Sequence, residues 1–433
     1  MGMARWWRKS FRGLRMGVVS CALPVLVGAL LALSPWAHAQ TELTLVTWFE
    51  PGSLDPVIEA FEAENPDIRV VVNFVAGPRE SFEAVLVRTA GGAPPDLAMV
   101  QHGERALAMT SDIFLDLAPY IQRDLQIEEY LPEIVRFWNQ NQLVGGPGQI
   151  IFPLVAYTGV IYYNEDLFQQ AGLLNPKELH ARDAWTREAF EEAARRITRR
   201  SPDGALETVG FAMIPSWIEG TFIHNAGGRL FDEAATRTLI TEQPFVDAVQ
   251  WLADLIHVNG VAVVDSWDHQ WFLTNRAGMM HNAAWMMGML NETDVRYDLA
   301  PLFYTGEHRP HNSPSGDAIA ILKDSPNIDA AWRFVRFMVS PEGLRHFTAG
   351  VPVHREVAQE YGRGVDRPSN MAAFVYETAT KMAVFYPADI PAEATDPIWQ
   401  ATSRVYAGEV PASVALREVA GVVDAVLAEW RAR

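Results

Sequence analysis

Residues 44–72 read TLVTWFEPGSLDPVIEAFEAENPDIRVVV, and this stretch decides the fold class. Its first part, residues 44–48, is a short apolar run of the kind that forms a buried strand. A break follows, and Asp55 before Pro56 is typical of the first turn of a helix. Residues 68–72 then form a second apolar run rich in valine, which predicts a second strand directly after the helix.

The same alternation continues along the chain. A helix through Phe82 and Val85 is expected to stop at Gly91, and residues 96–100 predict a third strand. Further strands are expected at 149–153 and 160–163, and further helices at 244–259, 283–291, 328–339, 341–349 and 412–431. Strands that alternate with helices predict an α/β fold, with a largely parallel sheet covered by helices on both faces.

Polar cap residues predict where three more helices begin. Asn164, Thr186 and Ser340 each stand directly before a run with helical spacing. Pro341 fits the first turn after Ser340, and Gly172 is expected to close the helix that Asn164 opens.

The N-terminal segment, residues 1–39, has the pattern of a signal peptide. The segment contains five basic residues and no acidic residue. Gly17–Leu33 is almost wholly apolar, and Ala37–Ala39 fits a signal-peptidase site. A transmembrane anchor is the alternative, and Cys21 suggests lipid attachment, although it lies before most of the apolar run. We expect cleavage near Gln40 and export to the periplasm.

Composition excludes several classes of partner. Without residues 1–39 the chain carries 30 Lys and Arg against 53 Asp and Glu, a balance that disfavours nucleic acid and anionic membranes. Cys21 is the only cysteine, so the mature chain holds neither a disulfide nor a thiolate metal site. An apolar content of 49% in a chain of this length is enough for two domains.

Sequence motifs of catalysis and cofactor binding are missing. Gly-x-Ser-x-Gly, His-Glu-x-x-His, P-loop and EF-hand patterns do not occur in the chain. These motifs therefore give no reason to expect a cofactor or a bound metal, while a catalytic pair of carboxylates stays open in so acidic a chain.

Several segments of the chain, taken together, resemble one family. They are Leu43 to Trp48, Phe61 to Val70, Ala90 to Asp96, Ile151 to Pro153, Tyr162 to Phe168 with Ala171-Gly172, Ala184 to Phe190, Arg276 to Met280 with Trp285, Ala330 to Phe334, and Gly350 to Val353. Through them, residues 43–431 resemble the extracellular solute-binding proteins of ATP-driven importers, the large family that includes the maltose-binding protein. Asn275-Arg276 departs from the usual Gly-Lys, away from the expected ligand face.

The resemblance implies a two-lobed periplasmic-binding-protein fold with a hinge and a ligand cleft between the lobes. It places the N-terminal lobe at 41–151 plus 300–348 and the C-terminal lobe at 152–299 plus 349–433, with crossings near 152–157, 298–301 and 349–353. It also implies a monomer that captures a mono- or oligosaccharide by closing its lobes and delivers it to the permease subunits of an ABC transporter.

Candidate site residues follow from where ligands bind in such folds. Ligands of open α/β sheets sit beyond the carboxyl ends of strands, and a sugar needs aromatic faces and polar hydrogen-bonding groups. The candidates are Trp48 and Glu50 after the first strand, Gln101 after the third, Tyr157 and Thr158 at the first crossing, Trp217 in a loop, Asn282 and Trp285 in a motif segment, and Gly316 and Asp317 before a late strand.

Each candidate has a competing structural interpretation. Trp48 could pack under the adjacent helix, and Trp285 could belong to a Met-rich core helix, although the resemblance places it where the family stacks on sugar. Gln101 could be an ordinary loop residue. A glycine such as Gly316 would let a ligand approach the backbone, and Asp317 could accept a ligand hydroxyl.

Three other functions stay open at this point. Tyr162-Tyr163-Asn164 also resembles the glycerol-phosphate-binding branch, but the strand-end segments contain no Arg or Lys for a phosphate. A secreted glycoside hydrolase would need a carboxylate pair, which an acidic chain can supply. A sensor of the same fold would feed a receptor instead of a permease.

Overall fold

The computed structural model divides the chain into the segment Met1–Gln40 and one compact unit, Thr41–Arg433. It describes residues 40–139, 148–214, 217–266, 269–306, 310–312, 315–347, 349–363, 368–380 and 390–432. The expected signal peptide, residues 1–39, lies outside the described residues. No helix in the described part of the chain is both long enough and apolar enough to cross a membrane.

The first sheet has six strands in the order β12-β4-β11-β3-β1-β2. They are β1 (Thr41–Thr47), β2 (Ile68–Phe74), β3 (Leu97–Gln101), β4 (Phe152–Ala156), β11 (Gly316–Ile321) and β12 (Val351–Pro352). β1 pairs in parallel with β2 and β3, whereas β11 is antiparallel to both β3 and β4. The expectation of a largely parallel sheet is therefore wrong. The chain returns from the second sheet at the end of the first sheet where β3 and β4 finish, so β11 runs antiparallel between these two strands.

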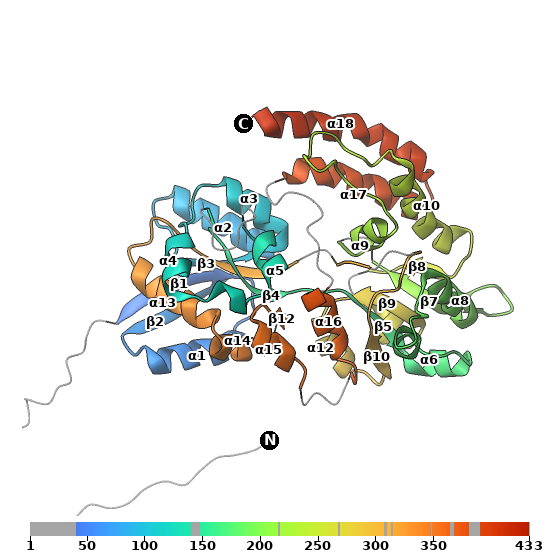
Figure 1. The fold of residues 1–433 in the computed structure, drawn as a ribbon, viewed down its shortest axis with the longest axis horizontal. Coiled ribbons are helices and arrows are strands. Elements are labelled where there is room, and N and C mark those ends of the chain that lie inside the picture. The colour runs from blue at the N-terminus through green and yellow to red at the C-terminus, as the bar shows by residue number, and fades with distance from the viewer. Residues whose placement is uncertain are drawn as a thin grey trace, which may run out of the picture. The chain divides into compact units, whose positions relative to one another are not determined.

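The second sheet has the strand order β10-β5-β9-β7-β6, and β8 pairs with β7. Its strands are β5 (Val160–Asn164), β6 (Arg199–Arg200), β7 (Leu206–Met213), β8 (Ala262–Val264), β9 (Ala277–Asn282) and β10 (Tyr297–Ala300). β7 runs parallel to β8 and β9, while β5 is antiparallel to both of its neighbours. Each sheet with its helices forms one lobe (Figure 1).

Helices pack around both sheets (Figure 1). Those of the first lobe are α1 (Asp55–Glu64), α2 (Pro78–Ala90), η1 (His102–Glu104), α3 (Arg105–Thr110), α4 (Ala118–Asp124), η2 (Ile127–Glu129), α5 (Pro132–Phe137), α13 (Ile328–Met338), α14 (Pro341–His346) and α15 (Arg355–Glu360). Those of the second lobe are α6 (Glu165–Gln170), α7 (Pro176–His180), α8 (Arg187–Ile197), α9 (Trp217–Asn225), α10 (Gln243–His257), α11 (Gln270–Leu273), α12 (Met286–Asn291), α17 (Ala392–Tyr406) and α18 (Ala412–Ala432). One further helix, α16 (Ala372–Thr380), contacts strands of both sheets.

The three predicted helix caps are confirmed by side-chain hydrogen bonds. Asn164 accepts from the Leu167 amide at 3.0 Å, and Ser340 accepts from the Gly343 amide at 3.2 Å. Thr186 caps α8 in the same way. These bonds satisfy backbone N–H groups that have no partner within the first helical turn.

Two expected elements differ from the structure. Trp217 was expected in a loop but is the first residue of α9, and the helix expected at 283–291 begins only at Met286. Residues 283–285 lie between β9, which ends at Asn282, and α12, in a turn that ends with Trp285. The apolar run continues through this turn, so periodicity could not locate the first residue of the helix.

The crossings between the sheets lie beyond β4, β10 and β12. Because β4 and β12 pair within the first sheet and α15 packs on β12 and α14, residues 152–156, 351–352 and 355–360 belong with the N-terminal lobe, not the C-terminal lobe that the expected ranges gave them. The remainder of the expected lobe division stays a prediction.

Candidate functional site

Three of the candidate residues meet at one end of the first sheet, where β3 finishes and β11 begins. Gln101, the last residue of β3, is the direct register partner of Asp317 in β11. Tyr157, just after β4, donates its amide to the Ser315 carbonyl at 2.9 Å and its hydroxyl to the Asp317 carboxylate. Residues far apart in sequence thus form one polar cluster, as the strand-end rule predicts.

Asp317 is the most deeply placed member of this cluster. Its side chain is fully buried, and burial raises its pKa from 3.8 to about 7. The Tyr157 hydroxyl and the side chain of Gln101 act in the opposite direction, while the nearby charge of Glu104 raises the pKa further. Burial, together with the charge of Asp317, also raises the pKa of Tyr157. Near neutral pH this carboxyl is therefore poised between its two protonation states.

Glu104 is a member of the cluster that sequence reasoning missed. It lies in η1, directly after β3, and burial raises its pKa from 4.5 to about 7. Its Oε2 atom is buried and has no hydrogen-bond partner among the described residues. Searching three residues beyond the strand end for carboxylates, and not stopping at Gln101, would have identified it.

The only cation next to this cluster in sequence is turned away from it. The Arg105 guanidinium lies 3.6 Å from the centre of the Phe137 ring, and its Nη1 donates to the Phe137 carbonyl at 3.1 Å. His102 is neutral at physiological pH, because burial and the charge of Arg105 lower its pKa to about 4. The charge of Arg79 acts on Glu104 and lowers its pKa, so the cluster combines two carboxyl groups with one nearby cation.

Gly316 is explained by strand pairing. Its φ is +151°, and a Cβ at this position would lie 2.0 Å from the carbonyl oxygen of Val155 in β4. The space that a side chain would need is filled by the backbone of the neighbouring strand. The sequence-based reason for this glycine, close approach of a ligand, is corrected accordingly.

Trp48 and Glu50 follow β1 on the same sheet. The Trp48 ring is half-buried, stacks on Phe49 with ring centres 5.4 Å apart, and packs against the core of the first lobe. Glu50 is exposed. Trp48 therefore keeps part of its ring available to a ligand, although its other part is core.

The second lobe contributes Asn282 and Trp285. Asn282 ends β9 opposite Val160; its Oδ1 accepts from the Ala283 amide at 2.8 Å, while its buried Nδ2 has no partner in the described part of the chain. Trp285 precedes α12 and is half-buried, with its ring centre 5.2 Å from that of His269. Both remain candidates for ligand contact.

Thr158 and Trp217 do not match their expected positions. Thr158 was expected to face the ligand, but its side chain is fully buried and its hydroxyl hydrogen-bonds to Thr378 of α16. It therefore joins the crossing segment to α16 and does not face a ligand. The backbone of Trp217 opens α9, while its side chain lies outside the described residues.

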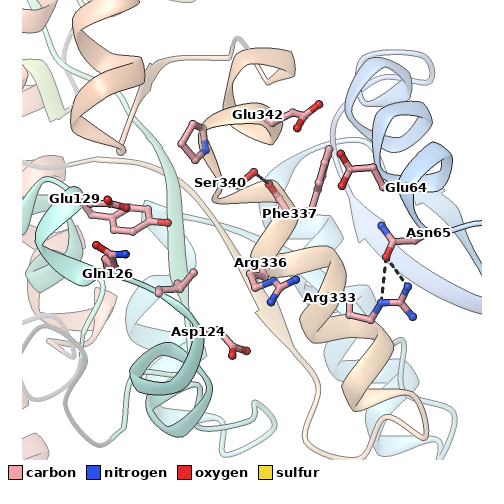
Figure 2. Close-up of a pocket in the computed structure, with 13 residues that line it drawn as sticks. Glu64, Asn65, Asp124, Gln126, Glu129, Arg333, Arg336, Phe337, Ser340 and Glu342 are labelled. Carbon is pink, nitrogen blue, oxygen red and sulfur yellow. Dashed lines mark hydrogen bonds between the residues drawn. The ribbon is translucent and has the colours of Figure 1, made fainter.

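A surface pocket elsewhere on the first lobe contains none of the candidate residues. It has a volume of about 400 Å³ and is bordered by the end of α1, the segment from α4 to η2, and the helices α13 and α14 (Figure 2). Arg333 on its wall is held by Asn65 and Asp67, with guanidinium–oxygen distances down to 2.5 Å for Asn65 and 2.7 Å for Asp67. Among the described residues no group of His, Cys, Asp and Glu is arranged to hold a metal ion.

Comparison with known proteins gives one family. The profile described as "Bacterial extracellular solute-binding protein" matches residues 50–344. A putative binding protein of Brucella abortus (strain 2308) is 25% identical over 392 residues, covering 86% of this chain and 89% of that protein. The sn-glycerol-3-phosphate-binding periplasmic protein UgpB of Escherichia coli O1:K1 is 26% identical over 157 residues, covering 34% of this chain and 35% of that protein.

Solved structures share the fold at low sequence identity. An ABC substrate-binding protein of Listeria monocytogenes in complex with cycloalternan has a TM-score of 0.74 at 22% identity, covering 90% of this chain and 99% of that one. The sugar-binding protein MalE of Xanthomonas citri has a TM-score of 0.75 at 18% identity, covering 90% and 98%. UgpB of Mycobacterium tuberculosis in complex with glycerophosphocholine has a TM-score of 0.76 at 15% identity, covering 90% and 99%.

Proposed function

Because this chain belongs to the bacterial extracellular solute-binding proteins, we propose that it is the substrate-binding component of an ABC importer and captures a mono- or oligosaccharide. Capture takes place in the periplasm, after removal of residues 1–39. The protein acts as a monomer, delivers its ligand to the permease subunits, and performs no chemistry on it.

The observation that carries the sugar proposal is the polar cluster at the ends of β3 and β4. Asp317, Glu104 and Gln101 supply acceptors at one edge of the sheet, and Arg105 is turned towards Phe137. Such a set suits the hydroxyl groups of an uncharged ligand, because a carboxyl group accepts a hydrogen bond from a hydroxyl when it is ionised and can also donate one when it is protonated. Half-buried Trp48 and Trp285 offer the aromatic faces that a sugar ring needs.

Lobe closure is the proposed route of capture. The chain passes from the first sheet to the second through residues 157–159 and returns through residues 301–315, so the two halves of the site stand on separate sheets. A ligand that contacts both halves favours the closed arrangement by its differential affinity for it. The permease then recognises the closed form.

A glycerol phosphate or a related polyol is the second candidate ligand. The similarity to UgpB of Escherichia coli and to the structure of UgpB of Mycobacterium tuberculosis favours it. A phosphate group demands cationic or amide donors, and near Asp317 these are the Gln101 amide and the charge of Arg79, set against the carboxyl groups of Asp317 and Glu104, so we rank this ligand second.

The deciding experiment is a thermal-shift screen followed by calorimetry. The panel contains maltose, maltotriose, trehalose, a cyclic maltosyl-maltose, glycerol, glycerol 3-phosphate and glycerophosphocholine. A true ligand at 100 times its Kd stabilises the folded protein by about 2.7 kcal/mol. Stabilisation by a sugar alone supports the proposal, and stabilisation only by the phosphate compounds replaces it with the second candidate. Chromatography of the recovered ligand tests for hydrolysis, and cleavage products would contradict a binding role.

A further inference from the structure

A buried carboxylate on α16 holds one of the connections between the two sheets. The Oε1 atom of Glu377 accepts from the Leu302 amide at 3.2 Å, and its Oε2 atom accepts from Asn312 Nδ2 at 2.9 Å. Leu302 and Asn312 both lie in the connection from β10 in the second sheet to β11 in the first. Glu377 and Asn312 are buried, so water does not compete for these bonds.

The next residue on the same helix holds the other connection. The hydroxyl of Thr378 hydrogen-bonds to that of Thr158, between β4 and β5. The two connections are also bonded to each other, because Ser315 donates its hydroxyl to the Tyr157 carbonyl at 2.9 Å. Adjacent residues of one helix thus contact two of the three chain segments that pass between the sheets, those after β4 and after β10.

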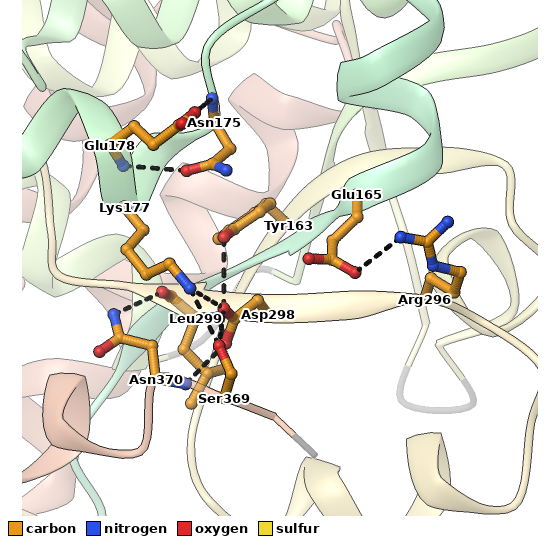
Figure 3. Close-up of polar contacts among 10 residues, drawn as sticks. All are labelled: Tyr163, Glu165, Asn175, Lys177, Glu178, Arg296, Asp298, Leu299, Ser369 and Asn370. Carbon is orange, nitrogen blue, oxygen red and sulfur yellow. Dashed lines mark hydrogen bonds and ion pairs between the residues drawn. The ribbon is translucent and has the colours of Figure 1, made fainter. Parts of the chain in front are cut away.

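The segment before α16 is itself fixed to the second sheet (Figure 3). Asp298 of β10 is almost fully buried and accepts from Ser369 Oγ at 2.6 Å and from the Asn370 amide at 2.8 Å. Lys177 Nζ lies 2.5 Å from the same carboxylate, and Asn370 Nδ2 donates to the Leu299 carbonyl at 2.9 Å. The segment before α16 is therefore tied to β10 by three hydrogen bonds, and Lys177 of α7 pairs with the same carboxylate.

α16 also contacts β12 of the first sheet and β5 of the second, and it lies beside β12 in Figure 1. This helix is anchored to one sheet, contacts the other, and is bonded to the connections after β4 and β10. Any rotation of the lobes must therefore move α16 or break some of these contacts. We propose that Glu377 is a positioning residue for ligand capture, which acts through the two connections and sets the ligand-ready arrangement of the lobes without contacting the ligand.

Glu377 can act in this way only through its two acceptor oxygens, so substitutions that keep or remove them should differ in effect. Glu377→Leu keeps the volume but removes both acceptors, and it leaves the Leu302 amide and the Asn312 amide group buried without this partner. Glu377→Gln keeps one acceptor for Leu302, and its amide can donate to Asn312 Oδ1 after that side chain flips, because Oδ1 has no partner among the described residues. The glutamine variant should therefore rescue what the leucine variant loses.

The first measurement needs no ligand. In a Cys21→Ser background, cysteines replacing Val87 beside β1 and Val258 after α10 carry spin labels; these positions are 71% and 74% exposed. Pulsed electron resonance gives the distance between the lobes. We expect Glu377→Leu to broaden the distribution and move its mean by more than about 2 Å, while Glu377→Gln and the exposed helical control Glu418→Leu keep the wild-type distribution.

The second measurement is calorimetric titration with maltose, maltotriose and glycerophosphocholine. This arm rests on the proposed function. For the probe that binds wild type, Glu377→Leu should raise the Kd at least about fivefold, the low end of ordinary coupling between sites, because a smaller share of the molecules is in the ligand-ready arrangement. Glu377→Gln should stay within twofold of the wild type, with ~0.4 kcal/mol as the corresponding limit.

The outcomes separate the two ideas. An unchanged distance distribution or an unchanged Kd in a folded Glu377→Leu protein overturns the role of Glu377 while the sugar proposal stands. A shifted distribution in a protein that binds none of the three probes supports the role of Glu377 and counts against the sugar proposal. If Glu377→Leu does not fold, Thr378→Val, compared with Thr378→Ser, provides the same test at the other connection.

Discussion

At the scale of single residues, the site combines half-buried aromatic rings with carboxyl groups that are buried or half-buried. Asp317 could be predicted as a site residue because it stands at the start of a strand after a polar loop. Its bond to Tyr157 spans 160 positions of the chain, and no local pattern encodes such a contact. Glu104 stands three residues past the end of β3 and could have been found by a longer search there, but only the pairing of β3 with β11 shows that its charge acts on Asp317.

The aromatic part of the site makes the first residue-scale prediction. Replacing Trp285 by Ala should weaken sugar binding by about 2 kcal/mol, the scale of an interface hot spot, because the substitution removes a half-buried aromatic ring from the proposed site. Calorimetric titration measures the loss. Trp430→Ala is the matched control, since that ring is also half-buried but lies on α18. Equal affinity of Trp285→Ala and wild type would remove this residue from the site.

The buried carboxyl makes the second prediction, on pH. A folded-state pKa of about 7 against 3.8 for the model acid means that the folded protein holds the proton of Asp317 more tightly than the unfolded chain. Its contribution to stability is complete below pH 4 and is lost as the pH rises to 7, with roughly 4 kcal/mol as the upper limit for three pKa units. Glu104 adds a smaller loss over the same window, because it is partly exposed.

Urea denaturation between pH 4 and pH 8 tests the pH prediction. Asp317→Asn cannot titrate, so its unfolding free energy should fall less over this window than that of the wild type. Glu50→Gln is the control, because this exposed carboxyl lies after β1. Parallel pH curves for Asp317→Asn and wild type would show that Asp317 is ionised in the folded protein well below pH 7.

At the scale of elements, caps were predictable and pairing directions were not. Asn164, Thr186 and Ser340 determine helix starts through bonds to amides three residues away, so the sequence contains the whole interaction. The direction of β11 depends on where the chain comes from, which is a property of the other lobe. Thr158 was misjudged for the same reason, because its partner Thr378 comes from a helix 220 positions further on.

Strand pairing at β4 and β11 makes the element-scale prediction. Gly316→Ala should cost about 2–4 kcal/mol, because the new Cβ meets the Val155 carbonyl and the backbone conformation is strained for other residues. Gly288 on α12 has open space around its Cα, so Gly288→Ala should be neutral or stabilise by up to about 1 kcal/mol. Chemical denaturation compares the two; a neutral Gly316→Ala would mean that β4 and β11 can separate at this point.

At the scale of the whole molecule, the resemblance read from scattered motifs is confirmed by the family profile over residues 50–344, and the two-lobed α/β fold is confirmed by structural neighbours. The fold is shared at 15–22% identity, because it depends on the pattern of apolar and polar positions more than on the identity of most side chains. The ligand is different: its contacts come from a few side chains whose identities vary freely within the same frame.

The position of β11 between β3 and β4 also bears on biogenesis. The middle of the first sheet is completed by a strand that the ribosome makes only after every strand of the second sheet. A nascent chain that has emerged as far as β10 therefore lacks the piece that closes its N-terminal half, and such long-range pairing forms slowly. Because the first sheet is completed late, the chain stays unfolded for longer during synthesis. A translocation channel requires an unfolded chain.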